Sequence, residues 1–236
     1  GCGRFDLCQS YLEQAEQIPR RYWGWRLFFF AIEYYQSYLE SCDLSQIEET
    51  LDKALAMAHD YQDYFPTDER GYDKEAELCL FANRRDDAQR ILEHAVFGIV
   101  DAGDGVRTSI VAAQCCVTLL EKVLADSTDY RLIIKIAQRG IRNTTQKQPS
   151  VRIGYFVYRE ALAQDALICD AQDRREGFGN LEKVRDALMS YRCAYDLLDD
   201  ADYRSTIERR YSILCHKSGI FDMPLVEGKA KEPADE

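Results

Sequence analysis

The chain has 236 residues, 46% of them hydrophobic, which is enough for one compact domain or one short solenoid with a substantial core. Acidic residues number 41 against 30 basic ones, and the net charge of −11 disfavours nucleic acid, whose backbone is bound mainly by Lys and Arg. We therefore expect a protein or peptide partner of basic or apolar character, while two domains are possible but not required and the oligomeric state is open.

Helix-length apolar patterns alternate with short polar breaks along the chain, and no alternating run is long enough for a sheet. The pattern predicts an all-α protein of about nine to ten helices. In chain order they cover about 5–17, 22–41, 45–64, 67 to a break at 83–85, 88–100, 106–125, 129–144, 151–171, 181–199 and 203–217. Ser45 followed by Glu48 predicts a capping box at the start of the third helix.

Successive helices are expected to pair as stacked antiparallel hairpins, with 203–217 capping the stack. We predict one helical-repeat domain over 1–221 and a charged, proline-bearing tail or linker over 222–236, which has too few bulky residues to order itself. The chain opens Gly1-Cys2-Gly3 without an initiator Met, which we interpret as an excised domain or processed product of a larger protein.

A small residue, a large one four positions on and a small one three further recur on single helix faces, which allows a neighbouring helix to approach closely. The copies are Ala88, Leu92 and Ala95; Ala187, Tyr191 and Ala194; and, more loosely, Leu51, Leu55 and Ala58, and Ile133, Ala137 and Gly140.

This signature resembles the second helix of the tetratricopeptide repeat (TPR) family, and Tyr72 with Ala76 resembles its first helix. The copies lie 37, 45 and 54 residues apart, whereas the family repeats every ~34, so the chain is similar to a divergent, lengthened TPR-like α-solenoid. The resemblance implies a scaffold that binds peptides or helices along a concave face of first helices. Asp73 and Glu77 stand where the family's carboxylate clamp has Lys and Asn, so that role is not expected.

Aromatic residues surround the helix at 22–41 almost completely, so a single core face cannot absorb them. They are Tyr22, Trp23, Trp25, Phe28, Phe29, Phe30, Tyr34, Tyr35 and Tyr38. Either neighbouring helices cover them on two sides or some rings form an interface.

A second candidate group lies on the helix from Val151, where Arg152, Tyr155, Phe156 and Arg159 share one face. Two guanidinium groups beside a phenol could hold a carboxylate or phosphate, and ordinary ion pairs are the alternative.

Nine cysteines, an odd number without regular spacing, do not indicate a disulfide framework. Most lie in apolar helical stretches, so we interpret Cys79, Cys115, Cys116, Cys169 and Cys193 as small core residues. With no secretory signal or membrane span in the sequence, we expect a cytoplasmic, reducing location.

No catalytic, phosphate-binding or metal-binding motif occurs, so we expect no cofactor and no enzyme activity, although an enzyme built on carboxylates such as Asp165 and Asp170 stays an alternative. The predicted function is a protein-interaction scaffold or adaptor that binds a peptide or helix; the alternative is a ligand- or peptide-sensing domain that controls an effector. The candidate partner-binding residues are Trp23, Trp25, Tyr34, Tyr38, Asp73, Glu77, Arg152, Tyr155 and Arg159.

Overall fold

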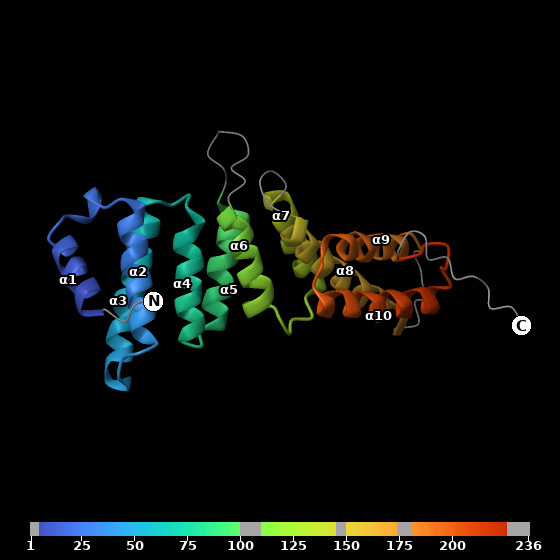
Figure 1. The fold of residues 1–236 in the computed structure, drawn as a ribbon, viewed down its shortest axis with the longest axis horizontal. Coiled ribbons are helices and arrows are strands. Elements are labelled where there is room, and N and C mark those ends of the chain that lie inside the picture. Colours follow the sequence, from blue (N-terminus) through green and yellow to red (C-terminus); the bar gives the residue numbers. More distant parts are fainter. Residues whose placement is uncertain (1–4, 100–109, 145–149, 174–180, 226–236) are drawn as a thin grey trace, which may run out of the picture. The chain divides into compact units, whose positions relative to one another are not determined.

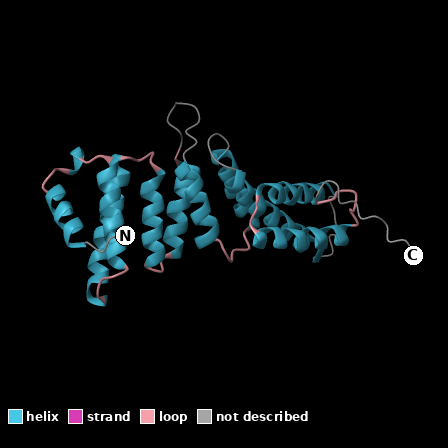
Figure 2. Ribbon diagram, in the orientation of Figure 1, coloured by secondary structure: helices cyan, strands magenta, loops and turns pink. Residues whose placement is uncertain are grey.

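A computed structural model describes residues 5–99, 110–144, 150–173 and 181–225, and within these ranges every regular element is helical (Figure 2). The α-helices are α1 (Phe5–Glu16), α2 (Trp25–Leu39), α3 (Leu44–Tyr64), α4 (Glu69–Phe81), α5 (Arg85–Glu93), α6 (Ile110–Thr118), α7 (Tyr130–Thr144), α8 (Ser150–Asp173), α9 (Leu181–Leu197) and α10 (Ala201–Ser218) (Figure 1). Three short elements join them: the 3₁₀ turn η1 (Arg20–Tyr22) and the π-helical turns η2 (His94–Gly98) and η3 (Leu119–Val123). The all-α prediction is confirmed.

Two predicted helix starts are wrong in detail. The helix expected from 22 begins at Trp25, because 20–22 form a separate 3₁₀ turn and Gly24 precedes the helix in an extended conformation. The predicted capping box is also wrong: α3 begins at Leu44 after an extended Asp43, so Ser45 already lies inside the helix.

The chain forms two compact units where one domain over 1–221 was predicted. Unit 1 comprises 1–107 and 117–123, and unit 2 comprises 108–116 and 124–236. Each unit has its own hydrophobic core within the described residues.

The core of unit 1 centres on α2 and α3, where Phe28, Ile32 and Tyr61 are completely buried. The rings of Phe28 and Tyr61 meet edge to face at 5.8 Å. Gly71 of α4 lies directly against the Tyr61 ring, where a larger residue would not fit, so α4 packs closely on α3.

The core of unit 2 is built on α8, which packs against both α7 and α9, while α10 packs on α9. Two glycines allow the close approaches. A Cβ atom at Gly140 would lie 2.5 Å from the buried Phe156 ring, and one at Gly154 would lie 2.9 Å from the Cβ of Leu197.

The predicted tail over 222–236 is partly incorporated into unit 2. Met223 and Leu225 pack against its core, and the Tyr211 hydroxyl donates a hydrogen bond to the Met223 carbonyl. Residues 226–236 lie outside the described residues.

The small-large-small signature marks buried helix faces in α5 with η2 and in α9, where all six of its residues are buried. In α7 the looser copy, Ile133, Ala137 and Gly140, is buried as well. In α3 Ala58 is buried as expected, whereas Leu51 and Leu55 are half-buried beside the buried Ala54, Met57 and Tyr61. The signature therefore located the buried face in α5, α7 and α9 and only part of it in α3.

Cysteine burial was predicted correctly for Cys79, Cys115 and Cys116. Cys169 is only half-buried and Cys193 is exposed, which corrects the prediction for these two. All cysteines among the described residues are free thiols.

Candidate interaction surface

The aromatic helix α2 is contacted by three neighbours, α1, α3 and α4, which is why its rings occur on every side. Phe28 and Ile32 face the core. Trp25 and Phe29 face the cations of α4, and Tyr34 and Tyr38 lie toward α1. Neighbouring helices thus cover α2 only in part.

A cavity of about 310 Å³ opens between α1, α2 and α3, and we call it the tyrosine cavity. It is lined by Gln9, Leu12, Glu13, Glu16, Tyr34, Tyr35, Tyr38, Gln46, Glu49, Thr50 and Lys53. The two candidate residues Tyr34 and Tyr38 therefore lie together in its wall.

The tyrosine rings of this cavity form an ordered aromatic wall. Tyr34 and Tyr38, one helical turn apart on α2, stack with their centroids 6.1 Å apart, and Tyr35 meets Tyr34 edge to face at 5.3 Å. Phe5 of α1 packs against both stacked rings, and the Tyr38 hydroxyl donates to the Gln46 side chain at 3.0 Å. Contacts on both sides fix the wall before any ligand binds.

The cavity is acidic, because the carboxylates of Glu13, Glu16 and Glu49 face a single lining cation, Lys53. The Lys53 ammonium already pairs with Glu49 at 2.6 Å. Burial, followed by the neighbouring Tyr35, raises the pKa of Tyr34, and Glu13 contributes in the same direction.

Charged and aromatic groups also join α2 to α4. The guanidinium of Arg70 lies 3.9 Å from the Trp25 ring centre, and the Lys74 ammonium lies 5.5 Å from that of Phe29. Lys74 further pairs with Glu33 on α2.

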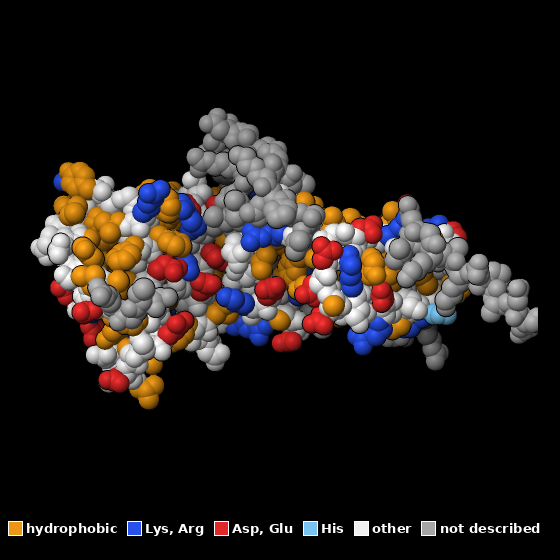
Figure 3. All heavy atoms as spheres, in the orientation of Figure 1, with side chains coloured by type: hydrophobic (Ala, Val, Ile, Leu, Met, Phe, Trp, Pro, Cys, Tyr) orange, Lys and Arg blue, Asp and Glu red, His pale blue; other side chains and the backbone are white. Residues whose placement is uncertain are grey.

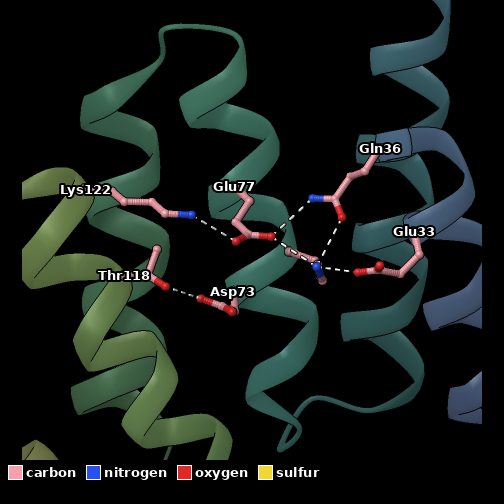
Figure 4. Close-up of polar contacts among 7 residues, drawn as sticks. Glu33, Gln36, Asp73, Glu77, Thr118 and Lys122 are labelled. Atoms are coloured by element: carbon pink, nitrogen blue, oxygen red, sulfur yellow. Dashed lines mark hydrogen bonds and ion pairs between the residues drawn. The ribbon is translucent and has the colours of Figure 1, made fainter. Parts of the chain in front are cut away.

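Asp73 and Glu77 of α4 also reach α6 and η3 (Figure 4). Figure 4 shows Glu77 between Gln36 of α2 and Lys122 of η3, with the Lys122 ammonium 3.2 Å from its carboxylate. Thr118, at the end of α6, donates to Asp73 at 2.9 Å. The polar groups of α4 thus bind neighbouring helices of unit 1.

The pKa values of Asp73 and Glu77 on α4 are shifted in opposite directions. Burial raises the pKa of Asp73, and the hydrogen bond from Thr118 offsets only part of that effect. Burial also opposes ionisation of Glu77, but Lys74 and Lys122 outweigh it and hold the pKa of Glu77 below its usual range.

Three of the candidate residues are buried or already engaged by neighbouring side chains. Trp23 is only 4% exposed, and its indole N–H donates to the carbonyls of Ala15 and Ile18, so it anchors α1 to the core. Asp73 is also buried, and Glu77 is engaged on both sides, which removes all three from the candidate surface. Trp25 is 38% exposed beneath Arg70.

The remaining candidates, Arg152, Tyr155 and Arg159, belong to unit 2. Tyr155 is buried, with its ring 5.5 Å from that of Phe156, and Arg152 reaches Gln114 at 3.5 Å. Burial of the phenol corrects the expectation that it forms an anion-binding face with the two guanidinium groups.

The carboxylate considered for catalysis, Asp165, is 1% exposed and held within the core of unit 2. It accepts hydrogen bonds from Tyr191 at 2.9 Å and from Arg210 at 2.8 Å. Asp170 is exposed on the same helix and does not join this cluster. The Asp165 arrangement is an internal ion pair, which stabilises the packing of α8 with α9 and α10.

Two searches of the described residues gave negative results. No group of three or more His, Cys, Asp or Glu side chains there is arranged to hold a metal ion. None of the helices in the described ranges is both long and apolar enough to cross a membrane.

The acidic part of the cavity was missed by sequence reasoning. Glu13 and Glu16 lie on α1 and Glu49 on α3, in segments that read as ordinary solvated helix faces. Only the packing of three helices places them opposite the tyrosines. The spacing of Tyr34 and Tyr38, four residues apart, was the available signal.

Comparison with models of protein families, with curated proteins and with solved structures finds no match for this chain. Its function is therefore inferred from its own side chains.

Proposed function

We propose that this chain is a protein-interaction module, a divergent TPR-like helical array that binds a peptide or helix of a partner protein through unit 1. The observation that carries the proposal is the tyrosine cavity, a concave site of about 310 Å³ between α1, α2 and α3. A cavity with a preformed aromatic wall binds at a low cost in ordering entropy, and aromatic side chains dominate the energetics of interfaces.

The array is supported by the contacts among first helices. In unit 1 a series of contacts connects α2, α4 and η3 in succession. Arg70 of α4 lies over the Trp25 ring of α2, and Glu77 of α4 pairs with both Lys74 on its own helix and Lys122 of η3. Such side-by-side first helices are what a stack of hairpins requires.

Exposed apolar side chains on unit 1 support a partner surface there. Within the described residues they include Leu7, Tyr11, Ile18, Tyr22, Trp25, Phe30, Leu44, Tyr64, Phe81 and Phe97. Figure 3 shows hydrophobic side chains among charged ones on the face of the N-terminal helices that it displays. None of these side chains lines the tyrosine cavity, so they offer additional apolar contact surface on unit 1.

Selection of binding peptides from a displayed random library, with the purified chain as target, tests this function. Tyr38→Ala, which removes one ring of the cavity wall, is expected to weaken the selected peptides about tenfold or more. The matched control is Tyr11→Ala, because Tyr11 is a 58% exposed tyrosine of unit 1 outside the cavity lining. Equal affinities for both variants and the parent chain, with circular dichroism unchanged, would refute binding at this cavity.

The alternative is a sensor domain that binds a small ligand, and the modest cavity volume is the observation that favours it. A sensor should be stabilised by a small molecule alone, because a ligand that binds only the folded state raises its stability. Thermal-shift screening of metabolites and short peptides separates the two functions. If a metabolite stabilises the chain and no binding peptide can be selected, the sensor function is supported and the interaction module is refuted.

A further inference from the structure

We infer that the tyrosine cavity takes the cationic side chain of a Lys or Arg residue in the partner peptide. This inference rests on the proposed function and adds the chemical class of the ligand.

The size of the cavity suits one side chain. Sites for drug-sized ligands usually start at ~300 Å³, and this cavity of about 310 Å³ lies at that lower limit. A long, narrow side chain fits such a space, whereas a folded element has to remain outside it.

The rings of Tyr34, Tyr35 and Tyr38 line the cavity. The negative face of an aromatic ring attracts an ammonium or guanidinium group placed over it within ~6 Å. Unit 1 already contains contacts of this kind, the two shortest of which place Arg20 3.7 Å from the Trp23 ring centre and Arg70 3.9 Å from that of Trp25. A ligand cation would repeat this arrangement on Tyr34 and Tyr38.

The charges select a cation over an anion. Three lining carboxylates face one lining ammonium, and that ammonium is held by Glu49. Arg20 approaches Glu16 at 3.8 Å, whereas Glu13 accepts its hydrogen bond from the neutral amide of Gln9 at 2.9 Å. Among the described residues Glu13 has no ion-pair partner, so an incoming cation finds an uncompensated carboxylate.

The ionisation of the tyrosine hydroxyls is consistent with a negatively charged cavity. Burial raises the pKa of Tyr35, and the Glu16 charge raises it further, with Lys53 and Arg20 acting in the opposite direction. Tyr34 and Tyr35, whose pKa values are both raised, therefore stay uncharged at neutral pH, and the carboxylates determine the sign of the charge in the cavity.

The test uses the full chain, labelled with ¹⁵N, and three blocked tripeptides that carry Arg, Lys or citrulline between two glycines. Citrulline keeps the shape of Arg without its charge. We expect the Arg and Lys peptides to shift the amide resonances of residues that line the cavity, and the citrulline peptide to leave them in place. Because exposed charges are screened, the Arg affinity should also fall as salt is raised.

The charge is tested by the double variant Glu13→Gln and Glu16→Gln, for which we expect about tenfold weaker binding of the Arg peptide. The matched control is Glu40→Gln with Glu48→Gln, two exposed carboxylates outside the lining, which lowers the net acidity equally. Affinity in the control should stay within about twofold of the parent chain. If the double variant fails to fold, the contribution of the carboxylates is measured instead with the single variant Glu13→Gln and with the salt dependence of Arg-peptide binding.

The inference is overturned if citrulline binds as tightly as Arg, if the double variant binds the Arg peptide unchanged, or if the shifts map outside the cavity. Its failure differs from failure of the proposed function. If the selected peptides depend on Tyr38 but place a neutral residue in the cavity, the proposed peptide-binding function holds and the inference of a cationic ligand is refuted. If the cavity binds a cation but no peptide can be selected, the preference for a cation holds and the proposed peptide partner is refuted.

Discussion

Asp73 and Glu77 show how the surroundings of a single residue decide its contribution. They are one helical turn apart on α4, yet Asp73 is buried beside a hydroxyl and Glu77 lies between two ammonium groups. Burial raises the pKa of Asp73, so its ionised form is less stable in the folded chain than in the unfolded one. For Glu77 the two cations overcome burial and lower the pKa, so its ionised form favours folding.

Asp73→Asn and Glu77→Gln should therefore change stability with pH in opposite directions. The penalty from Asp73 develops as pH rises through the ordinary carboxyl range, so Asp73→Asn should match the parent chain in acid and exceed it at neutral pH. The stability from Glu77 is present above the ordinary carboxyl range and is lost as pH falls through its lowered pKa, so Glu77→Gln should be the less stable variant only near neutral pH. We expect differences on the order of 1 kcal/mol in the free energy of unfolding, measured by urea titration across pH 3–7. Parallel pH curves for both variants and the parent chain would contradict these pKa directions.

The helices of this chain were predictable because each depends on local pattern. Apolar periodicity and polar breaks located all ten α-helices of the described residues, and errors arose at ends such as that of α3, where Asp43 and not Ser45 precedes the helix. The tyrosine cavity was not predictable. Its acidic residues lie on α1 and α3, and no local signal specifies which polar faces of separate helices will meet. Only Tyr34 and Tyr38, neighbours on one helix, could be found beforehand.

Helix packing in unit 2 depends on glycine at positions where a side chain would collide with a neighbour. Gly140 on α7 faces the fully buried Phe156 of α8, and an added Cβ would lie 2.5 Å from two carbons of its ring. Alanine favours helix formation over glycine by ~1 kcal/mol, while overpacking of a core costs about 1–3 kcal/mol. The clash should decide the outcome because Phe156 is surrounded and has little room to move.

Gly140→Ala should therefore lower the free energy of unfolding by up to about 2 kcal/mol, which is the overpacking cost less the gain in helix propensity. A double-mutant cycle with Phe156→Leu isolates the contact, since a shorter, non-aromatic side chain leaves room for the added methyl group. Gly140→Ala should cost less in the Phe156→Leu background than in the parent chain, as measured by urea denaturation. An equal cost in both backgrounds would show that this ring does not set the distance between α7 and α8.

At the scale of the whole molecule, the two units have separate cores. One core is drawn from α1 to α4 and the other from α8 to α10, within the described residues. Both tryptophans, Trp23 and Trp25, belong to unit 1. Tryptophan fluorescence consequently reports on unit 1, whereas far-ultraviolet circular dichroism reports on the helices of both units.

This asymmetry allows unit 2 to be destabilised and followed separately. Asp165→Ala removes the acceptor shared by Tyr191 and Arg210 and should cost unit 2 about 2–4 kcal/mol, because a buried hydroxyl and a partly buried cation lose their partner. Asp170→Ala, an exposed change on the same helix, should stay within about 0.5 kcal/mol of the parent chain. If each core unfolds on its own, Asp165→Ala will shift part of the circular dichroism transition to lower urea and leave the fluorescence midpoint in place. A fluorescence midpoint that falls together with the dichroism would mean that the cores unfold as one cooperative block, since a loss confined to unit 2 can reach the tryptophans only through coupled unfolding.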